Sequence, residues 1–411
     1  MVCEEYADVS SQAVDWDRPR IEDALARIDM PDAIEILAEL IPIESTWEHE
    51  GPLAHHLERR FRRWGFPEVT LVNFPPGRPS VIARIPGTGG GRSLMLNGHL
   101  DIYEISADWT LNPWTLTRVD GRLHGAGIAD MKSGTAACIA AAKFILDQNI
   151  PLRGDLFLAC VGAHFEGGVG TRALVTSGIR PDGAIVAEPS FMELVIAQRG
   201  SAYLDITTKG RQAHSSAPDK GINAIYKMSQ VLDGLQRLEL EHEPHPLLGK
   251  SYIMNVGTIR GGTRYSQVPD RCTISVDFRF PPSQSALGVK QHVEEMIAAL
   301  SAEDPDFDAE VGFNEHWLWG PRIPYEVDTS WEILRTVDRA TGIALGAPAK
   351  HVGMLAWTDM AVLGQAGTEA VNIGPGGSPL NFPDEYVLES EFEGAIRTYV
   401  GAALDYCNQS P

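Results

Sequence analysis

The stretch GTAACIAAAKFILDQNIPLRGDLFLACVGA, residues 134–163, decides the class of fold. Its first half reads as a helix, and its last nine residues, DLFLACVGA, form an apolar run that is typical of a buried strand. Directly after this strand, and before two glycines, stand His164, Phe165 and Glu166. An apolar ring therefore lies between two side chains that are able to bind a metal ion or to transfer a proton.

The same alternation continues on both sides of this stretch. Leu53, Leu57, Phe61 and Trp64 follow helical spacing, with basic residues on the other face, which predicts an amphipathic helix. Further patterns predict strands at 80–85, 93–101, 183–190 and 369–374, and helices at 171–178, 329–342 and 390–407. Strands that alternate with helices predict an α/β fold with a mixed, mostly parallel sheet and helices on both faces.

A different pattern begins near Gly200. The segment beyond it reads as strands at 201–210, 251–262 and 272–280 and as helices at 220–238 and 288–302. Two helices on one antiparallel sheet form a small α/β sandwich that is able to fold by itself. We therefore expect a catalytic domain in two parts, residues 1–198 and 316–411, and an inserted lid domain at 199–315.

The composition excludes several classes of protein. The chain has 411 residues, of which 44% are hydrophobic and 22% charged, as in a globular protein of more than one domain. Acidic residues outnumber basic ones by 55 to 34, which gives a formal charge of -21. This charge repels nucleic acid and anionic membrane surfaces, so we expect neither as a partner.

The cysteines and the N-terminus indicate the compartment. The five cysteines are scattered and contain no CxxC pair, so we expect them to be reduced: Cys3, Cys138, Cys160, Cys272 and Cys407. The N-terminal residues are polar and acidic, unlike a secretory signal peptide. No apolar run reaches the roughly 18 residues that a membrane-spanning helix needs. We expect a cytoplasmic protein.

Four side chains follow the ends of predicted strands: His99, Asp130, Glu166 and Glu188. Taken singly, each has an ordinary explanation as a structural histidine, a capping residue or a solvated carboxylate. Together they lie at the edge where open α/β sheets build their sites. One imidazole and several carboxylates suit Zn²⁺, Mn²⁺ or Co²⁺, so the sequence predicts a metal site.

With these residues in place, the chain resembles the metal-dependent aminoacylase family, which includes carboxypeptidase G-type enzymes, acetylornithine deacetylase and succinyl-diaminopimelate desuccinylase. Motifs in the order and spacing of that family cover most of the chain: GHLD, DGRLHGAGIADMKSG, EGGVG, AEPS, TKGRQAHSSAPDKGINAI, GGTRYSQVPD, VDFRFPP, WTDMAVLGQAG, NIGPGG and FPDEYV. The resemblance implies a catalytic domain that holds two metal ions, a lid domain that usually forms a homodimer, and hydrolysis of an amide next to a carboxylate.

The resemblance also implies roles for residues of the catalytic domain. His99, Asp130 and Glu188 match the ligands of one metal ion, with Asp130 as the usual bridge to the second ion. Asp101 matches the carboxylate that orients the metal-binding histidine, a common arrangement around metal sites.

Residues that contact the substrate are implied in the same way. His214 of the lid matches a histidine that stabilises the developing oxyanion, often in the neighbouring subunit. Arg279 matches a clamp for the substrate carboxylate, which suits the planar guanidinium. Thr358 and the turn at 374–377, which contains Gly376, match loop positions that face the substrate.

The chain departs from the family at the positions of the second metal ion and of the base. Phe165 stands where the family has its general base, and Glu166 aligns with a ligand of the second ion. Asn381 replaces a histidine ligand, and Ser266 replaces a lid asparagine. The simplest interpretation is one firmly bound ion and a doubtful second site, with Glu166 or His164 as a non-standard base.

We therefore predict a metal-dependent hydrolase that cleaves a C–N bond in a small carboxylate-bearing substrate by means of a water that the metal activates. Phe165 beside the metal suits a flat substrate, so an alternative is a hydrolytic deaminase of an activated, aromatic amino acid. Phe165 and Asn381 then belong to the substrate pocket. A second alternative is a catalytically inactive protein that binds a small acid through the metal.

Overall fold

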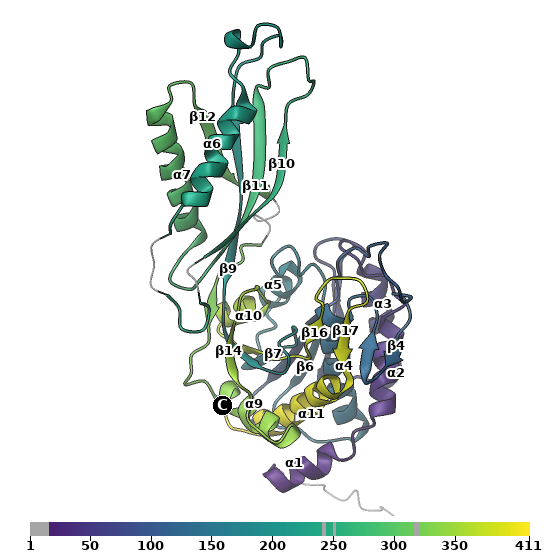
Figure 1. Cartoon of the computed structure of the whole chain (residues 1–411). Helices are drawn as coiled ribbons and strands as arrows, with labels where there is room; N and C mark the ends of the chain where they lie inside the picture. Colours follow the sequence, from purple (N-terminus) through teal and green to yellow (C-terminus); the bar gives the residue numbers. More distant parts are fainter. Residues whose placement is uncertain (1–15, 241–243, 250–251, 316–319) are drawn as a thin grey trace, which may run out of the picture.

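The computed structural model describes residues 16–240, 244–249, 252–315 and 320–411, and the account below refers to these residues. Cys3 and the first residues of the predicted catalytic domain lie outside them, as does the predicted boundary at residue 316. The chain forms a larger part, here called the body, and a smaller part that projects from it, here called the lid (Figure 1).

The body is built on a nine-stranded mixed sheet with the order β1-β2-β6-β3-β7-β15-β8-β13, in which β14 also pairs with β8. The strands are β1 (Glu68–Val72), β2 (Ser80–Ile85), β3 (Leu94–His99), β6 (Leu156–Val161), β7 (Gly183–Val186), β8 (Leu194–Gln198), β13 (Tyr325–Glu326), β14 (His351–Met354) and β15 (Glu369–Asn372). Strands β6, β3, β7 and β15 run parallel at the centre, whereas β1, β2 and β13 join the sheet in antiparallel pairs.

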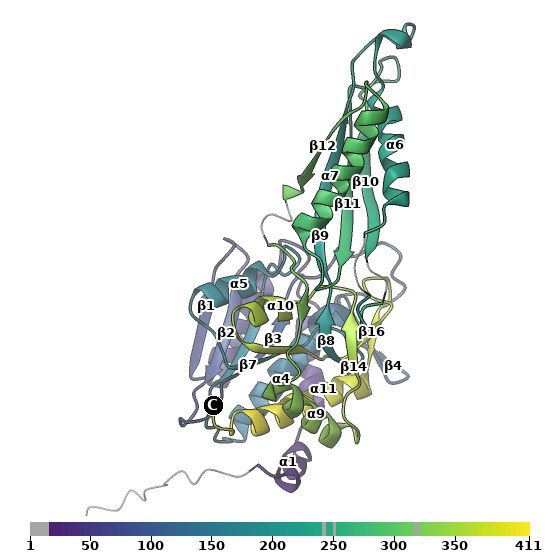
Figure 2. The same cartoon turned by 90° about the vertical axis from the view of Figure 1, so that its left-hand side faces the viewer.

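Helices cover both faces of this sheet. In Figures 1 and 2, α4 and α11 pack together on one face, and α5 and α10 lie on the other. The body helices are α1 (Arg18–Leu25), α2 (Met30–Leu40), α3 (Gly51–Trp64), α4 (Ser133–Asp147), α5 (Val169–Thr176), α9 (Glu332–Ala344), α10 (Met360–Gln365) and α11 (Glu389–Tyr406), with a single π-turn η1 (Ile128–Lys132). A small sheet is formed by β16 (Gly377–Ser378), β17 (Tyr386–Leu388), β5 (Arg122–His124) and β4 (Thr117–Val119).

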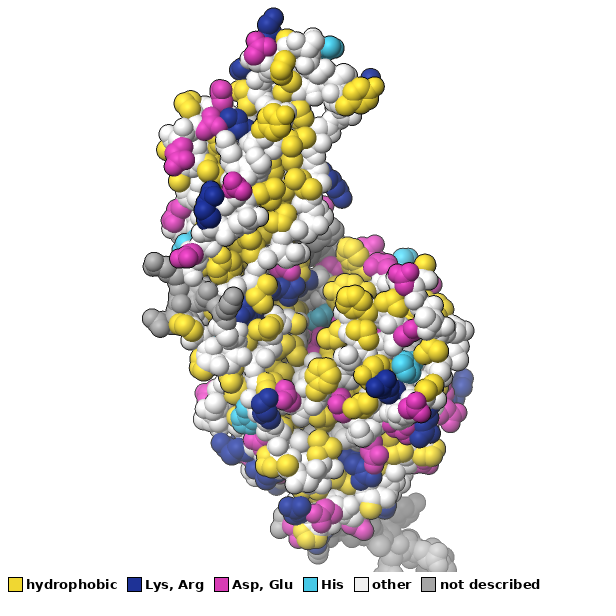
Figure 3. Space-filling view, viewed as in Figure 1, with side chains coloured by type: hydrophobic (Ala, Val, Ile, Leu, Met, Phe, Trp, Pro, Cys, Tyr) yellow, Lys and Arg dark blue, Asp and Glu magenta, His cyan; other side chains and the backbone are white. Residues whose placement is uncertain are grey.

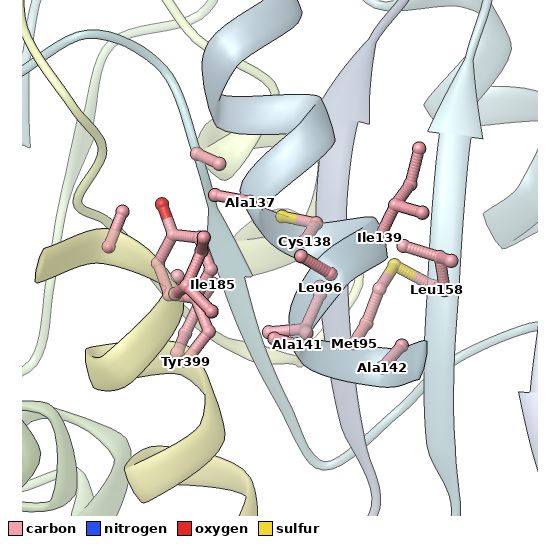
Figure 4. Close-up of a cluster of buried hydrophobic side chains, with 14 of the residues drawn as sticks. Met95, Leu96, Ala137, Cys138, Ile139, Ala141, Ala142, Leu158, Ile185 and Tyr399 are labelled. Atoms are coloured by element: carbon pink, nitrogen blue, oxygen red, sulfur yellow. The ribbon is translucent and has the colours of Figure 1, made fainter. Parts of the chain in front are cut away.

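The core of the body explains how the site is positioned. Met95 and Leu96 of β3 lie in one buried cluster with Ala137 and Ala141 of α4 (Figure 4), and all six residues of β3 are buried. Because these helix residues are small, α4 lies close to the strand. A Cβ atom at Gly98 would come within 2.5 Å of the side chain of Thr135, so the close approach requires glycine there. The last residue of β3, His99, is thereby placed at the edge of a rigid sheet.

The lid is a four-stranded antiparallel sheet with the order β10-β11-β9-β12 and two helices on one of its faces (Figure 2). Its elements are β9 (Gly200–Lys209), η2 (Pro218–Lys220), α6 (Ala224–Arg237), β10 (Ile253–Gly261), β11 (Arg271–Phe280), α7 (Ala286–Glu303) and β12 (Asp308–Phe313). Side chains of Asn223 and Ser285 cap the N-termini of α6 and α7. A separate apolar cluster between sheet and helices forms the core of the lid.

These features confirm the α/β class, the mixed sheet with helices on both faces, and the smaller α/β sandwich. The parallel pairs are β6 with β3, β3 with β7 and β7 with β15 at the centre of the body sheet, and β14 with β8 toward one end of it. Of the described cysteines, Cys138, Cys160, Cys272 and Cys407 are all buried and free. Within the described residues, no helix is both long enough and apolar enough to cross a membrane.

Candidate active site

The site is built around His99 at the end of β3. The Nδ1–H of His99 donates a hydrogen bond to the backbone oxygen of Asp101 at 2.9 Å, which leaves Nε2 to face the site. The Asp101 carboxylate lies farther away, at 3.9 Å from Nδ1. It instead accepts the backbone N–H groups of His164 and Phe165, at 3.2 and 3.0 Å. Asp101 therefore orients the imidazole with its carbonyl and holds the loop after β6 with its carboxylate.

His164 lies face to face with His99. The two rings are 4.3 Å apart between centroids and inclined by only 8°. The chain turns sharply after β6 because Ala163 adopts a φ of 56°, in the left-handed region. His164 donates from Nδ1 to the carboxylate of Asp359 at 3.0 Å, and Thr171 donates to the other oxygen of Asp359 at 2.6 Å.

Glu188, which follows β7, completes a cluster with the two histidines. Its Oε1 atom lies 3.5 Å from Nε2 of His99 and 3.3 Å from Nε2 of His164. All three side chains are buried, and their ligand atoms lie within 4.8 Å of one another. Oε1 of Glu188 has no hydrogen-bond partner among the described residues. Two imidazole nitrogens and a buried carboxylate oxygen are a donor set that suits a divalent ion such as Zn²⁺ or Mn²⁺.

Asp130 approaches the same point from η1. Its Oδ1 atom is 3.1 Å from Nε2 of His99, and its Oδ2 atom accepts a hydrogen bond from the amide of Asn381 at 3.1 Å. Asn381 has a φ of 57°, which directs its side chain toward Asp130. The amide that replaces the family's histidine therefore serves as a hydrogen-bond donor to a predicted metal ligand.

Glu166 lies apart from this cluster. One of its oxygens accepts short hydrogen bonds from the guanidinium of Arg78 and from the indole of Trp47. Arg78 also donates to Glu50 at 2.6 Å. Arg78, Glu50 and Glu166 are all buried. The second oxygen of Glu166 has no hydrogen-bond partner within the described part of the chain.

The pKa values of the ionisable groups follow from this arrangement. Burial works to lower the pKa of His99, but the carboxylates of Glu188 and Asp130 outweigh it and hold the pKa well above its ordinary value. Burial works to raise the pKa of Asp130, and the hydrogen bonds from His99 and Asn381 reverse the effect, so that this pKa is lowered. The same balance between burial and His164 lowers the pKa of Asp359. Without a metal ion, the cluster therefore favours the protonated, positively charged ring of His99 and the ionised carboxylates of Asp130 and Asp359.

A cavity of about 710 Å³ opens above the cluster, between body and lid. Figure 3 shows the hollow from one side, with basic, acidic and histidine side chains gathered in it. Aromatic side chains form much of the wall, and Phe165 lies 4.4 Å from Tyr103 between ring centroids. Body residues that line the cavity include Trp47, Tyr103, Asp130, His164, Phe165, Glu166, Glu188, Trp357 and Asn381.

The lid and the segment that follows it contribute cations to this wall. Arg279 of β11 lines the cavity and is paired with Asp277, with distances of 2.9 Å from Nε and 2.8 Å from Nη2. Arg322 also lines the cavity, donates to the backbone oxygen of Phe165, and stacks 4.8 Å above the ring of Tyr203. Both guanidinium groups thus line the cavity with protein acceptors already bound, the carboxylate of Asp277 for Arg279 and the carbonyl of Phe165 for Arg322.

Five predicted site residues do not line this cavity in the described chain: His99 and Asp101, which are described above, and Thr358, Gly376 and His214. Thr358 is buried and donates to Gln198 at 2.7 Å. The backbone N–H of Gly376 donates to Glu391, and a Cβ atom there would lie 2.2 Å from the ring of Phe191. His214 is exposed in the lid and bonds to Ser216 at 2.8 Å. His214 therefore lies outside the cavity of its own chain.

The sequence analysis did not identify Asp359, Arg78, Trp47 or Arg322. Asp359 stands in the quoted motif WTDMAVLGQAG, directly after the predicted Thr358, so the motif carried a signal. Arg78 and Trp47 stand in loops with no pattern around them. Their partner, Glu166, is 88 and 119 residues away, respectively.

Comparison with known proteins agrees with this architecture. The profile of the M20 peptidase dimerisation domain matches residues 196–305. The chain is 28% identical over 356 residues to N-formyl-4-amino-5-aminomethyl-2-methylpyrimidine deformylase of Halalkalibacterium halodurans, covering 79% of this chain and 81% of the relative. It is 29% identical over 352 residues to acetylornithine deacetylase of Myxococcus xanthus, covering 83% and 88%.

Among solved structures, a metallo-carboxypeptidase of the M20 family from Sulfolobus solfataricus has the same fold. Its TM-score is 0.74 at 16% identity, and the match covers 92% of this chain and 99% of the carboxypeptidase.

Proposed function

We propose that this chain is a member of the M20 family of metal-dependent hydrolases, and on that premise we propose the substrate class, the metal ligands and the proton acceptor of its reaction. The activity is that of a metallohydrolase of the aminoacylase and carboxypeptidase type, which cleaves a C–N bond. The observation that carries the proposal is the buried cluster of imidazoles and carboxylates on the floor of a large cavity.

The family depends on a divalent metal ion, and the donor set present here fits one. We assign His99, Asp130 and Glu188 as ligands of a single firmly bound ion, either Zn²⁺, Mn²⁺ or Co²⁺. Such an ion polarises the scissile group and makes water a stronger nucleophile at neutral pH. The pairing of Glu166 with Arg78, and of Asn381 with Asp130, argues against a second ion of equal affinity.

Glu166 is our candidate for the proton acceptor. The residue lines the cavity, and its second oxygen, although buried, has no hydrogen-bond partner among the described residues and keeps its capacity to accept a proton. The guanidinium of Arg78 holds the carboxylate in place through a hydrogen bond. Asp101 holds the loop that carries Phe165 and Glu166, and His214 is assigned to the oxyanion from a second subunit. If Glu166→Gln leaves turnover unchanged, this role of Glu166 is wrong.

The proposed substrate is a small molecule with a carboxylate, bound through Arg279. Hydrolysis of its amide consumes one water and releases an acid and an amine. A second candidate is the hydrolytic deamination of an activated aromatic amino acid. The aromatic wall formed by Phe165 and Tyr103, whose rings are tilted by 36°, favours this second candidate because a flat ring packs well against aromatic side chains.

The matched dimerisation domain favours a homo-oligomer. We propose a homodimer formed through the lid, residues 199–315, since β10 lies at the edge of the lid sheet and exposes Ile253 and Ile259. We propose the cytoplasm as its compartment, because the described cysteines are free.

The deciding experiment combines metal analysis with a substrate panel. Protein loaded in turn with zinc, manganese and cobalt is analysed for metal per chain, and is then assayed on N-acetyl, N-succinyl and N-formyl amino acids and on aromatic amino acids. One ion per chain and rapid cleavage of an acyl group support the first candidate, whereas release of ammonia from the aromatic acids supports the second. Two ions per chain contradict the mononuclear site, and failure of every substrate class contradicts the proposed function.

A further inference from the structure

We propose that His164 is itself a ligand of the metal ion, so that the site rests on two imidazoles and one carboxylate, and that Asp359 is the residue that positions the His164 ring. This inference rests on the proposed function and deepens it, because it changes which residues hold the ion. His164 stands in the altered motif HFEGG, directly before the phenylalanine that replaces the usual base.

The first argument is the direction of the ligand atoms. Nε2 of His99 and Nε2 of His164 both face the same oxygen, Oε1 of Glu188, at 3.5 and 3.3 Å. This oxygen is buried and has no hydrogen-bond partner among the described residues. A buried carboxylate oxygen without a partner costs free energy, and a cation shared by the three atoms removes that cost.

The second argument is that both rings have their other nitrogen occupied. His99 donates from Nδ1 to the Asp101 carbonyl, and His164 donates from Nδ1 to the Asp359 carboxylate. In each ring Nδ1 therefore carries a proton, so that the neutral ring offers the lone pair of Nε2 to a metal ion, which takes the place of a proton there. Hydrogen bonding of this kind, from a metal-binding imidazole to a carboxylate or carbonyl, is a general feature of metal sites.

The third argument is that the structure is arranged to hold Asp359 in place. Thr171 fixes the second oxygen of Asp359. Gly168 lies so close that a Cβ atom would come within 2.4 Å of Oδ1 of Asp359. A buried aspartate held at both oxygens imposes one orientation on the His164 ring, as precise metal geometry requires.

The fourth argument concerns Glu166. The Arg78 guanidinium and the Trp47 indole supply the positive charge and the hydrogen bonds that this carboxylate needs. Glu166 is thus stabilised without a metal ion. His164, from the same loop, contacts Glu188 in the cluster, where the resemblance would have Glu166 bind a metal ion. The resulting set of two histidines and one carboxylate leaves open positions, an arrangement suited to Mn²⁺, Fe²⁺, Co²⁺ or Zn²⁺.

The test uses the full-length protein loaded with Co²⁺ and observed by proton NMR in H₂O and in D₂O. Each imidazole bound to cobalt through Nε2 carries one Nδ1–H, which gives one strongly shifted signal that disappears in D₂O. We expect such signals from two imidazoles in the unmodified protein and from one in His164→Gln. A single signal in the unmodified protein overturns the inference without any variant, so a folding defect in His164→Gln cannot leave it undecided.

Competition with a chelator provides a second readout. We expect Asp359→Asn to keep both imidazole signals, at altered shifts, and to lose roughly 10–100-fold in cobalt affinity. The control is His351→Gln, because His351 also pairs with an aspartate, Asp338, at 3.0 Å but does not line the cavity. Cobalt affinity should not change in this control.

The variants also separate the inference from the proposed function. Suppose that His99→Gln no longer binds cobalt, whereas His164→Gln binds cobalt with unchanged affinity and still shows both Nδ1–H signals. The inference is then wrong, and the proposed metal site stands. If neither variant changes cobalt binding, the proposed metal site is wrong as well.

Discussion

The body and the lid bury their strands in different ways. Every residue of β3 in the body is buried, whereas β11 in the lid alternates between buried and half-buried positions. The body sheet has helices on both faces, and the lid sheet has them on one (Figures 1 and 2). Both observations follow from the sequence patterns, a continuous apolar run in one case and alternation in the other.

The difference extends to charged side chains. Between Gly200 and Phe313, the buried polar side chains of the described residues are Ser201, Thr207 and Thr208, none of them charged. The described body and its connections to the lid instead bury many ionisable groups: Glu50, Arg78, His99, Asp101, Lys132, His164, Glu166, Glu188, Arg199, Arg322, Asp359 and Glu385. Charges are costly to bury without partners, and buried ionisable groups gather at functional sites, so we expect the body to carry the chemistry and the lid to contribute to recognition of the substrate.

The largest effect that this comparison predicts is at His99. His99→Ala removes a ligand from the buried cluster, and we expect loss of tight metal binding and a fall in kcat/KM on the order of 10³-fold or more, since a metal contributes several kcal/mol to catalysis. Elemental analysis and steady-state kinetics measure both. The control is His55→Ala, on the exposed side of α3, which should leave both unchanged. Full metal loading in His99→Ala would contradict the assignment of His99 as a metal ligand and of the metal site to the body.

The second prediction concerns the buried charge network beneath the site. Arg78→Met leaves Glu50 and Glu166 without their cation, and we expect unfolding free energy to fall by about 3–5 kcal/mol. Arg84→Met is the matched control because Arg84 pairs with Glu68 and Asp155 near the surface, and its removal should cost about 0–1 kcal/mol. Urea unfolding measures both variants. Equal losses would show that burial does not distinguish the two networks.

The third prediction is a dependence on pH. Burial raises the pKa of Glu385 to about 8, from an ordinary value of 4.5. Its folded pKa is the higher one, so its contribution to stability is complete below about pH 4.5 and is lost as the pH rises through about 8. In Glu385→Gln the amide oxygen can still accept the hydrogen bond from the backbone N–H of Gly127. Because the amide does not ionise, the variant does not lose stability as the pH rises.

We therefore expect Glu385→Gln, free of metal, to be more stable than the original protein at pH 9 by on the order of a few kcal/mol, since each pKa unit corresponds to about 1.4 kcal/mol. At pH 4.5 the difference should nearly vanish. Thermal unfolding at both pH values measures it, with Glu393→Gln on the surface of α11 as a control. A gain that is the same at both pH values would refute the assignment to ionisation.

The smallest expected effect is in the lid. Arg279→Ala should raise KM by about 10–100-fold, because a hydrogen bond to a charged group is worth about 1.5–3 kcal/mol, while metal content stays the same. The control, Arg271→Ala, lies on the same strand and pairs with Glu310 at the surface. Loss of metal in Arg279→Ala would contradict the expectation that the body binds the metal ion and that the lid only helps to bind the substrate.

Much of the fold could be predicted because it depends on local patterns. The amphipathic helix predicted from Leu53, Leu57, Phe61 and Trp64 is α3, and the apolar run 155–163 contains β6. Several short strands were missed, among them β1, β8, β12 and β14, each of four to six residues, because so short a run gives too little pattern to be assigned. These omissions did not change the predicted architecture.

The site could be predicted only in part. The strand ends bring His99, Asp130 and Glu188 together because parallel strands meet at one edge of the sheet, and this follows from the order of elements. The partners of the altered motif do not follow from any spacing. His164 and Asp359 are 195 residues apart, and Arg78 and Glu166 are 88 residues apart.

The sequence by itself determined the α/β class, the inserted sandwich and the edge of the sheet at which the chemistry gathers, because apolar periodicity and element order act locally along the chain. Only the tertiary structure decided what the HFEGG motif does. It turns Glu166 toward Arg78 and His164 toward Glu188, since a buried side chain takes its role from the partners that folding places within hydrogen-bond distance.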